Sequence, residues 1–183
     1  YKNIEEAKNS IIIFSGFFTP SRVDEVLTVL RKPIEDGVKV KFVLPTNQTN
    51  GSFGKSDPSK SFDLVRLMRD RGVVVEQRSR LHQKAVLIDD DLAWYGSLNP
   101  LSFADSTLES MLLVRQPGIA LELAKSLSLP GSVAPSSMVD WAQSENPECP
   151  KCGSRTVYVK SRYGSYFPCE DTNCNGKVSI SRR

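Results

Sequence analysis

Long hydrophobic runs, a second histidine and internal repeats are all missing from this sequence of 183 residues. The longest apolar run, 11–14, has the length of a strand and falls far short of the ~20 residues that cross a bilayer, so we expect no membrane partner. No basic-then-apolar signal peptide opens the chain, and we therefore expect a cytoplasmic protein. The first residue is Tyr1 rather than Met, which is compatible with a piece of a longer protein.

Net charge is also small, at +3, but it is unevenly spread. Residues 149–183 contain seven basic and two acidic residues, whereas residues 1–148 contain 17 basic and 19 acidic residues. A polyanionic partner would therefore meet the C-terminal fifth first, although a solvated basic end is the simpler reading of charge alone. The 39% hydrophobic and 25% charged residues are typical of a globular protein with one ordinary domain and a small appendage.

Short apolar runs and helical periodicity alternate along the first two thirds of the chain. Runs rich in β-branched and aromatic residues predict strands at 10–14, 38–44, 73–75, 85–88, 92–95 and 110–114. Helical spacing predicts helices from a cap at Ser21 to a break or kink at Pro33, at about 62–71 and at 119–127. The alternation predicts an α/β fold, a layered sheet flanked by helices. Residues 46–59 are rich in Asn, Gly, Ser and Pro and predict a long loop that shapes or gates a substrate groove.

The one histidine, His82, belongs to a set of polar residues with a characteristic spacing. Lys84 follows two residues later, so on a strand both side chains point to the same face. Asp89 ends that strand, and the next strand leads into Gly96-Ser97-Leu98-Asn99. This arrangement resembles the HKD motif of the phospholipase D superfamily, and with the strand–helix–strand layout upstream the resemblance spans roughly residues 5–127.

The resemblance implies hydrolysis of a phosphodiester without a catalytic metal. Neutral imidazole is a nucleophile near neutral pH, so His82 would attack phosphorus. Lys84 would neutralise a non-bridging phosphate oxygen, and Asn99 and Ser97 would donate hydrogen bonds to it. Asp89 belongs to the motif, but we expect it to hold the strand connection and to break no bond.

Glu109 precedes the strand predicted at 110–114. In single-motif nucleases of this superfamily, a glutamate similarly placed after the Gly-Ser turn holds the histidine in one tautomer. The resemblance assigns this role to Glu109, since a carboxylate on the far nitrogen orients a nucleophilic imidazole. A solvated glutamate at a strand edge is the alternative.

The superfamily mechanism uses two histidines, whereas this chain has one motif and one histidine. We therefore predict a homodimer through the HKD face, whose two-fold axis passes between two copies of His82. One copy would form a phosphohistidine, and the other would act first as acid and then as base. A second domain outside this chain is the alternative source of the partner histidine, and the monomer alone should be inert.

The four cysteines all lie near the C-terminus, as Cys149-Pro-Lys-Cys152 and, after 16 residues, Cys169-x4-Cys174. Two close pairs at this separation predict a structural Zn²⁺ site, because four thiolates leave no open position for catalysis. The segment resembles the C-terminal zinc ribbons of type IA topoisomerases, with short strands at 156–160 and 164–167. Two disulfides in a secreted domain are the alternative, which the missing signal peptide disfavours.

These features predict a phospholipase D-like phosphodiesterase or nuclease domain at 1–128, a linker rich in Pro, Gly and Ser at 129–148, and a nucleic-acid-binding zinc ribbon at 149–183. We expect a metal-independent endonuclease acting on nucleic acid, with DNA ahead of RNA. A C-terminal part of a larger helicase- or restriction-type protein is compatible with this expectation.

The choice of nucleic acid depends on the basic ribbon and its aromatic residues, which stack on unpaired bases if exposed and form the ribbon core if buried. These aromatic residues are Tyr158, Tyr163, Tyr166 and Phe167. One alternative is a lipid phosphodiesterase or phosphatidyl transferase, for which the sequence shows no membrane anchor. The other is a non-cleaving DNA-binding module, for which a damaged motif is expected, whereas this motif is intact.

Overall fold

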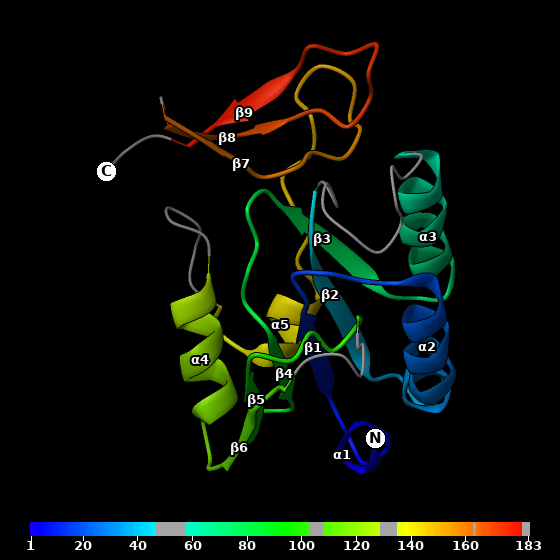
Figure 1. Ribbon diagram of the computed structural model, residues 1–183. Coiled ribbons are helices and arrows are strands. Elements are labelled where there is room, and N and C mark those ends of the chain that lie inside the picture. The colour runs from blue at the N-terminus through cyan, green and yellow to red at the C-terminus, as the bar shows by residue number, and fades with distance from the viewer. Residues whose placement is uncertain (47–57, 103–107, 129–134, 163, 181–183) are drawn as a thin grey trace.

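The computed structural model describes residues 1–46, 58–102, 108–128, 135–162 and 164–180 (Figure 1). Its helices are α1 (Lys2–Glu5), α2 (Pro20–Glu35), α3 (Pro58–Asp70), α4 (Ile119–Leu127) and α5 (Met138–Gln143). Its strands are β1 (Ser10–Phe14), β2 (Lys39–Pro45), β3 (Val74–Arg78), β4 (Ala85–Ile88), β5 (Leu92–Gly96), β6 (Met111–Arg115), β7 (Val159–Ser161), β8 (Gly164–Pro168) and β9 (Lys177–Ser179).

The main sheet has the strand order β3-β2-β1-β4-β5-β6. Strands β1, β2 and β3 are parallel to one another, whereas β4, β5 and β6 add to the sheet in antiparallel pairs. Parallel strands need helical crossovers, and α2 and α3 supply them. The mixed α/β class predicted from the sequence is confirmed.

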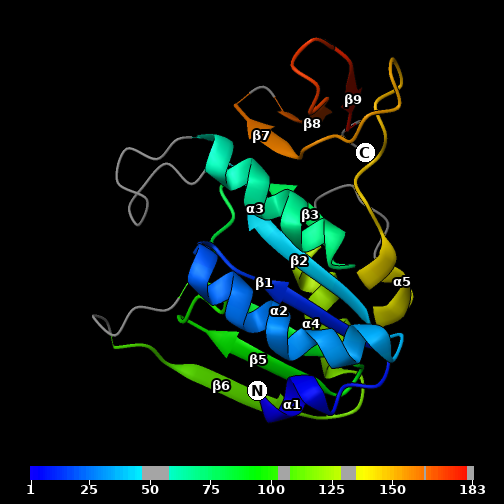
Figure 2. The same ribbon diagram turned by 90° about the vertical axis from the view of Figure 1, so that its right-hand side faces the viewer.

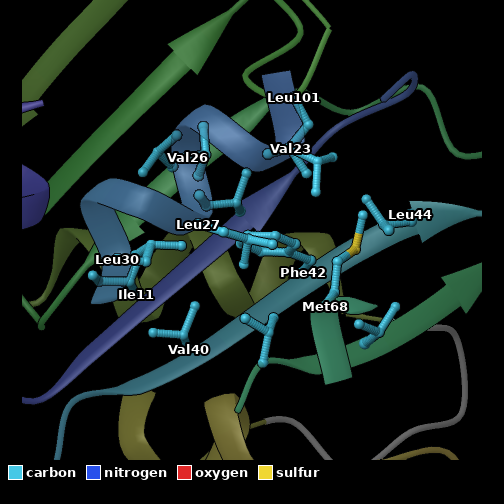
Figure 3. Close-up of a cluster of buried hydrophobic side chains, with 14 of the residues drawn as sticks. Ile11, Val23, Val26, Leu27, Leu30, Val40, Phe42, Leu44, Met68 and Leu101 are labelled. Atoms are coloured by element: carbon cyan, nitrogen blue, oxygen red, sulfur yellow. The ribbon is translucent and has the colours of Figure 1, made fainter. Parts of the chain in front are cut away.

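Helices cover both faces of this sheet, and β1 is therefore buried along its whole length. Ile11 and Ile13 belong to a core beneath α2 and α3 that includes Phe42 and Met68. Figure 3 shows Ile11, Phe42 and Met68 in this core. The alternate residues, Ile12 and Phe14, point into a second core beneath α4 and α5. Figure 2 shows α2 and α3 in front of the sheet.

Helix α2 starts earlier and continues further than its sequence predicts. Thr19 rather than Ser21 is the N-cap, and its hydroxyl accepts a hydrogen bond from Arg22 N at 3.4 Å. Pro20 takes the first helical position, where its missing N–H costs nothing. Pro33 lies in the last turn, where it removes one main-chain hydrogen bond, and the helix nevertheless continues to Glu35.

Residues 46–59, predicted as a long loop, fall largely outside the described residues. Helix α3 begins at Pro58, before the predicted start at 62. Strand β3 continues to Arg78, beyond the predicted end at Val75. The prediction was too short because two of the last residues of the strand are charged and yet buried. These residues form a network that the sequence pattern alone does not reveal.

Part of the predicted linker at 129–148 is packed structure. Helix α5 buries Met138, Trp141 and Ala142 in the second core, and the Trp141 ring lies 5.6 Å from that of Phe14. Lys41, completely buried in β2, donates to the carbonyl oxygens of Trp141 and Ser144 at 3.1 and 2.8 Å. This segment is therefore held on the sheet rather than serving as a free connection.

The C-terminal sheet of β7, β8 and β9 is antiparallel and also contacts the main sheet. Tyr158, just before β7, forms a parallel bridge with Arg78 at the end of β3. Arg69 of α3 forms a second contact, an ion pair of 3.6 Å with Glu170. Figure 1 shows the small sheet above the end of β3.

Candidate active site and metal centre

The motif residues gather where β1 ends and β4 begins. Because β4 is antiparallel to β1, the segment that enters β4 meets the carboxyl end of β1. Gly16 lies at this crossing: a Cβ there would stand 3.3 Å from Asn99 Oδ1 and 3.6 Å from His82 Cα. Asn99 Oδ1 also accepts a hydrogen bond from Phe17 N at 3.2 Å, which leaves its amide nitrogen as the donor for a ligand.

His82 is exposed, whereas Lys84 is only 7% exposed. The Lys84 ammonium donates to the main-chain oxygen of His82 at 2.7 Å, so the two residues are held together. Burial lowers the pKa of Lys84, and the negative charge of Glu109 opposes that shift. The Lys84 ammonium and the exposed His82 imidazole therefore lie close together. A phosphate could be bound by the ammonium and attacked by the imidazole.

Ser97 connects the motif turn to the segment that carries Glu109. Its hydroxyl accepts from Ser110 N at 3.0 Å, and its own N–H donates to Ser110 O at 2.9 Å. A Cβ on Gly96 would overlap the Ser110 carbonyl oxygen, so only glycine permits this close approach. The turn thus brings Glu109 close enough for its charge to act on Lys84.

Asp89 lies at the other end of β4, away from His82 and Lys84. Its carboxylate accepts from the main-chain N–H groups of Lys8, Asn9 and Ser10 at 2.9, 2.7 and 3.0 Å. It therefore joins the start of β1 to the end of β4.

The segment that supports the motif turn was not predicted from the sequence. Ser15 Oγ donates to Phe17 O at 2.6 Å and accepts from Leu101 N at 3.2 Å, which ties the end of β1 to the residues after Asn99. The available signal was a Ser-Gly pair directly after a buried strand, because ligands of α/β sheets bind at the carboxyl edge of the strands.

The four cysteine sulfur atoms lie within 4.8 Å of one another. Cys149 Sγ is 3.7 Å from Cys174 Sγ, and Cys152 Sγ is 3.5 Å from Cys169 Sγ. Tetrahedral ligands ~2.3 Å from a zinc ion stand about 3.8 Å apart, so the donor set fits Zn²⁺. A Cβ on Gly176 would overlap Cys149 Sγ, so glycine is required beside the cluster.

The environment distributes protons unevenly among these thiols. Hydrogen bonding with Ser154 lowers the pKa of Cys152 to about 6, whereas burial raises the pKa of Cys169 to about 12. A metal binds these residues as thiolates, so its binding would release the protons that the thiols hold.

Two of the four ribbon aromatics form its core. Tyr158 is 4% and Phe167 is 8% exposed, and their rings meet edge to face at 5.5 Å. Neither ring is available to stack on a base. Tyr166 is half-buried, and Tyr163 lies outside the described residues.

An exposed histidine beside a buried lysine, at the start of a central strand of a six-stranded α/β sheet, is the arrangement expected of a phospholipase D-like (HKD) domain. Residues 1–128 match the sequence model of the family described as cardiolipin synthase, PLD-like domain. The chain belongs to this family.

Among curated proteins, the chain is 32% identical over 99 residues to the probable cardiolipin synthase YwiE of Bacillus subtilis (strain 168). That match covers 54% of this chain and only 19% of the relative's length. No helix in the described part of the chain is long and apolar enough to cross a membrane.

Two solved structures share the fold. Nuc, a phospholipase D family member from Salmonella typhimurium, aligns with a TM-score of 0.51 and 20% identity over 67% of this chain and 77% of its own. NucT from Helicobacter pylori aligns with a TM-score of 0.50 and 18% identity over 67% of this chain and 78% of its own.

Proposed function

We propose that this chain is a metal-independent nuclease in which His82 is the nucleophile. The observation that carries the proposal is the meeting of His82 and Asn99 beside Gly16, with the Lys84 ammonium donating to the main-chain oxygen of His82. The imidazole would attack phosphorus and displace one ester oxygen, forming a phosphohistidine. Lys84 and Asn99 would stabilise the charge that develops on the non-bridging oxygens.

Water would then hydrolyse the phosphohistidine with the help of a second imidazole. Since His82 is the only histidine of the chain, a second copy would supply it across a two-fold axis. Leu108, next to Glu109, is fully exposed, and Tyr95 and Leu112 on the neighbouring strands are 45% and 65% exposed. Exposed apolar side chains beside the site favour such a contact.

The position and charge of the ribbon support nucleic acid as the substrate. Tyr158, just before β7, bridges in parallel to Arg78 at the carboxyl end of β3, and the segment that carries His82 enters β4 at this same end of the sheet. Lys160 and Arg162 are exposed there, and residues 157–169 contain no acidic side chain. Glu170 instead pairs with Arg69 on α3. A polyanion could therefore extend from the ribbon to the catalytic edge.

A lipid phosphodiester is the second candidate substrate, favoured by the family and by the probable cardiolipin synthase relative. A largely apolar pocket of about 340 Å³ adjoins the motif turn at Leu98 and Pro100. It is lined further by Ile13, Val86 and Trp94 and could take an acyl chain.

The test is cleavage of labelled single- and double-stranded DNA, RNA and phosphatidylglycerol vesicles by the parent and by His82→Ala. EDTA would be present, and the ribbon's metal content would be measured to verify that it stays loaded. We expect nucleic-acid cleavage by the parent alone. Turnover of vesicles without nucleic-acid cleavage would move the assignment to lipid, and undiminished cleavage by His82→Ala would overturn the mechanism.

A further inference from the structure

The ribbon is joined by main-chain hydrogen bonds to the segment that leads into His82. Tyr158 N donates to Gln77 O at 3.3 Å, and Ser79 N donates to Tyr158 O at 2.9 Å. Lys160 N donates to Ser79 Oγ at 2.8 Å. Ser79 lies three residues before His82, so the ribbon contacts the start of the catalytic segment 79–84.

Arg80, between this contact and His82, has a strained backbone. Its φ of 57° is left-handed, a conformation that is unfavourable for a residue with a Cβ. Such a conformation persists only when its surroundings hold it. Here Ser79 is held by the ribbon on one side, and Leu81, 7% exposed, is held by the second core on the other. Release of either residue would let Arg80 relax and displace His82.

The ribbon has little core of its own to maintain this contact. Its larger buried side chains are Tyr158 and Phe167, and its sheet has two strands of three residues and one of five. A unit of this size depends on a metal for much of its folding free energy. The sulfur cluster ties Cys149, which precedes β7, to Cys174, which precedes β9. Loss of the metal would therefore loosen Tyr158 from Ser79.

We infer that the ribbon is a positioning element for catalysis, in addition to any role in binding nucleic acid. A metal held by the four cysteines keeps Tyr158 against Ser79 and thereby keeps His82 in place beside Lys84. Loss of the metal lowers the rate of the chemical step, although the metal takes no part in the chemistry. This inference rests on the proposed role of His82 as nucleophile.

The test uses the full chain and bis(p-nitrophenyl) phosphate, a diester too small to bridge the ribbon and His82. We expect removal of the metal to lower kcat by about 10- to 100-fold, because small displacements of catalytic groups have effects of this size. KM should change less than about twofold, as expected when ground-state binding is kept. Zn²⁺ and Cd²⁺ should both restore kcat, because either ion can fold the ribbon.

Amide hydrogen exchange provides a readout that does not depend on activity. We expect exchange over residues 79–84 to accelerate when the metal is removed. Unchanged exchange there with an unfolded ribbon, or a loss seen only in KM, would overturn the inference. If the loaded protein hydrolyses no diester, the proposed function fails, while hydrogen exchange still tests the coupling.

A matched pair of variants separates the contact from the stability of the ribbon. Ser79→Ala removes the acceptor of the Lys160 N–H and should lower kcat while the metal stays bound. Ser179→Ala, at an exposed position of β9, should leave kcat unchanged. Equal kcat for the two variants and the parent would contradict the positioning role.

Discussion

His82 and Lys84 differ in burial, and this difference suits their proposed roles. An exposed imidazole can reach a large substrate, whereas a cation removed from water acts more strongly on nearby charge. Lys84→Gln should therefore lower kcat by about 10²–10³-fold, the usual cost of losing one group that stabilises the transition state. Steady-state kinetics would measure this, with the exposed Lys125→Gln as control. A loss of less than about threefold would remove Lys84 from the mechanism.

The charge of Glu109 should be visible in the pH profile. It raises the pKa of Lys84, which burial lowers, so Glu109→Gln should lower that pKa further. The alkaline limb of kcat against pH, where Lys84 loses its proton, should then move to lower pH. Lys84→Arg should remove this limb from whatever activity remains, because a guanidinium does not titrate in that range. An unchanged limb in Glu109→Gln would show that another group sets it.

Among the secondary-structure elements, β2 and β3 carry a buried network that stabilises the fold behind the site. Glu76 forms ion pairs with Lys41 at 2.7 Å and with Arg78 at 2.5 Å, and all three side chains are buried. Arg78 also donates to Leu127 O at 2.6 Å, which ties the end of α4 to β3. The network thus fixes the residue that precedes Ser79.

Glu76→Gln should destabilise the protein by about 3–5 kcal/mol, since it leaves two buried cations without their anion. Burial alone would raise the pKa of Glu76, but Lys41 and Arg78 outweigh it and lower the pKa below 4.5. The parent should therefore keep this stabilisation above pH 4.5 and lose it as the pH falls through the lowered pKa. Denaturant unfolding at several pH values would measure both effects.

The control for this prediction is Glu35→Gln, which breaks the exposed pair with Arg31 on α2 and should cost less than about 1 kcal/mol. Similar costs for the two variants would contradict the assignment of Glu76 to a buried network.

Strands made of apolar runs could be predicted closely, and elements that bury charge could not. Strand β4 and helix α4 have their predicted bounds, because hydrophobic periodicity alone defines them. The sequence predicts too short a β3, because charged residues such as Glu76 and Arg78 are expected to be exposed. Their buried partner Lys41 is distant along the chain. Helix α5 could not be predicted from its Ser-rich stretch, because its burial depends on the tertiary position of Trp141.

The same distinction applies to the site. The spacing of the motif from His82 to Asn99 is local and could be read from the sequence. The crossing at Gly16 and the contact between Ser79 and Tyr158 join segments distant along the chain. No periodicity in the sequence encodes such contacts.

At the scale of the whole molecule, the single histidine makes the oligomeric state part of the mechanism. Leu108→Asp should weaken dimerisation by about tenfold or more, because it places a charge in the proposed apolar contact. Its side chain is fully exposed, so the fold should be unaffected. The sedimentation coefficient and the specific activity should fall together across a dilution series of this variant. Leu113→Asp, an exposed position further along β6, is the control. An active monomer would contradict the shared site.

The central claim, that His82 forms a covalent bond to phosphorus, can be tested by rapid acid-free quenching of the parent with a short oligonucleotide. Peptide mass spectrometry would then locate the adduct. The account predicts a nucleotide or phosphate adduct on the peptide containing His82, labile to acid and absent from His82→Ala. Turnover without any adduct, or an adduct on another residue, would contradict it.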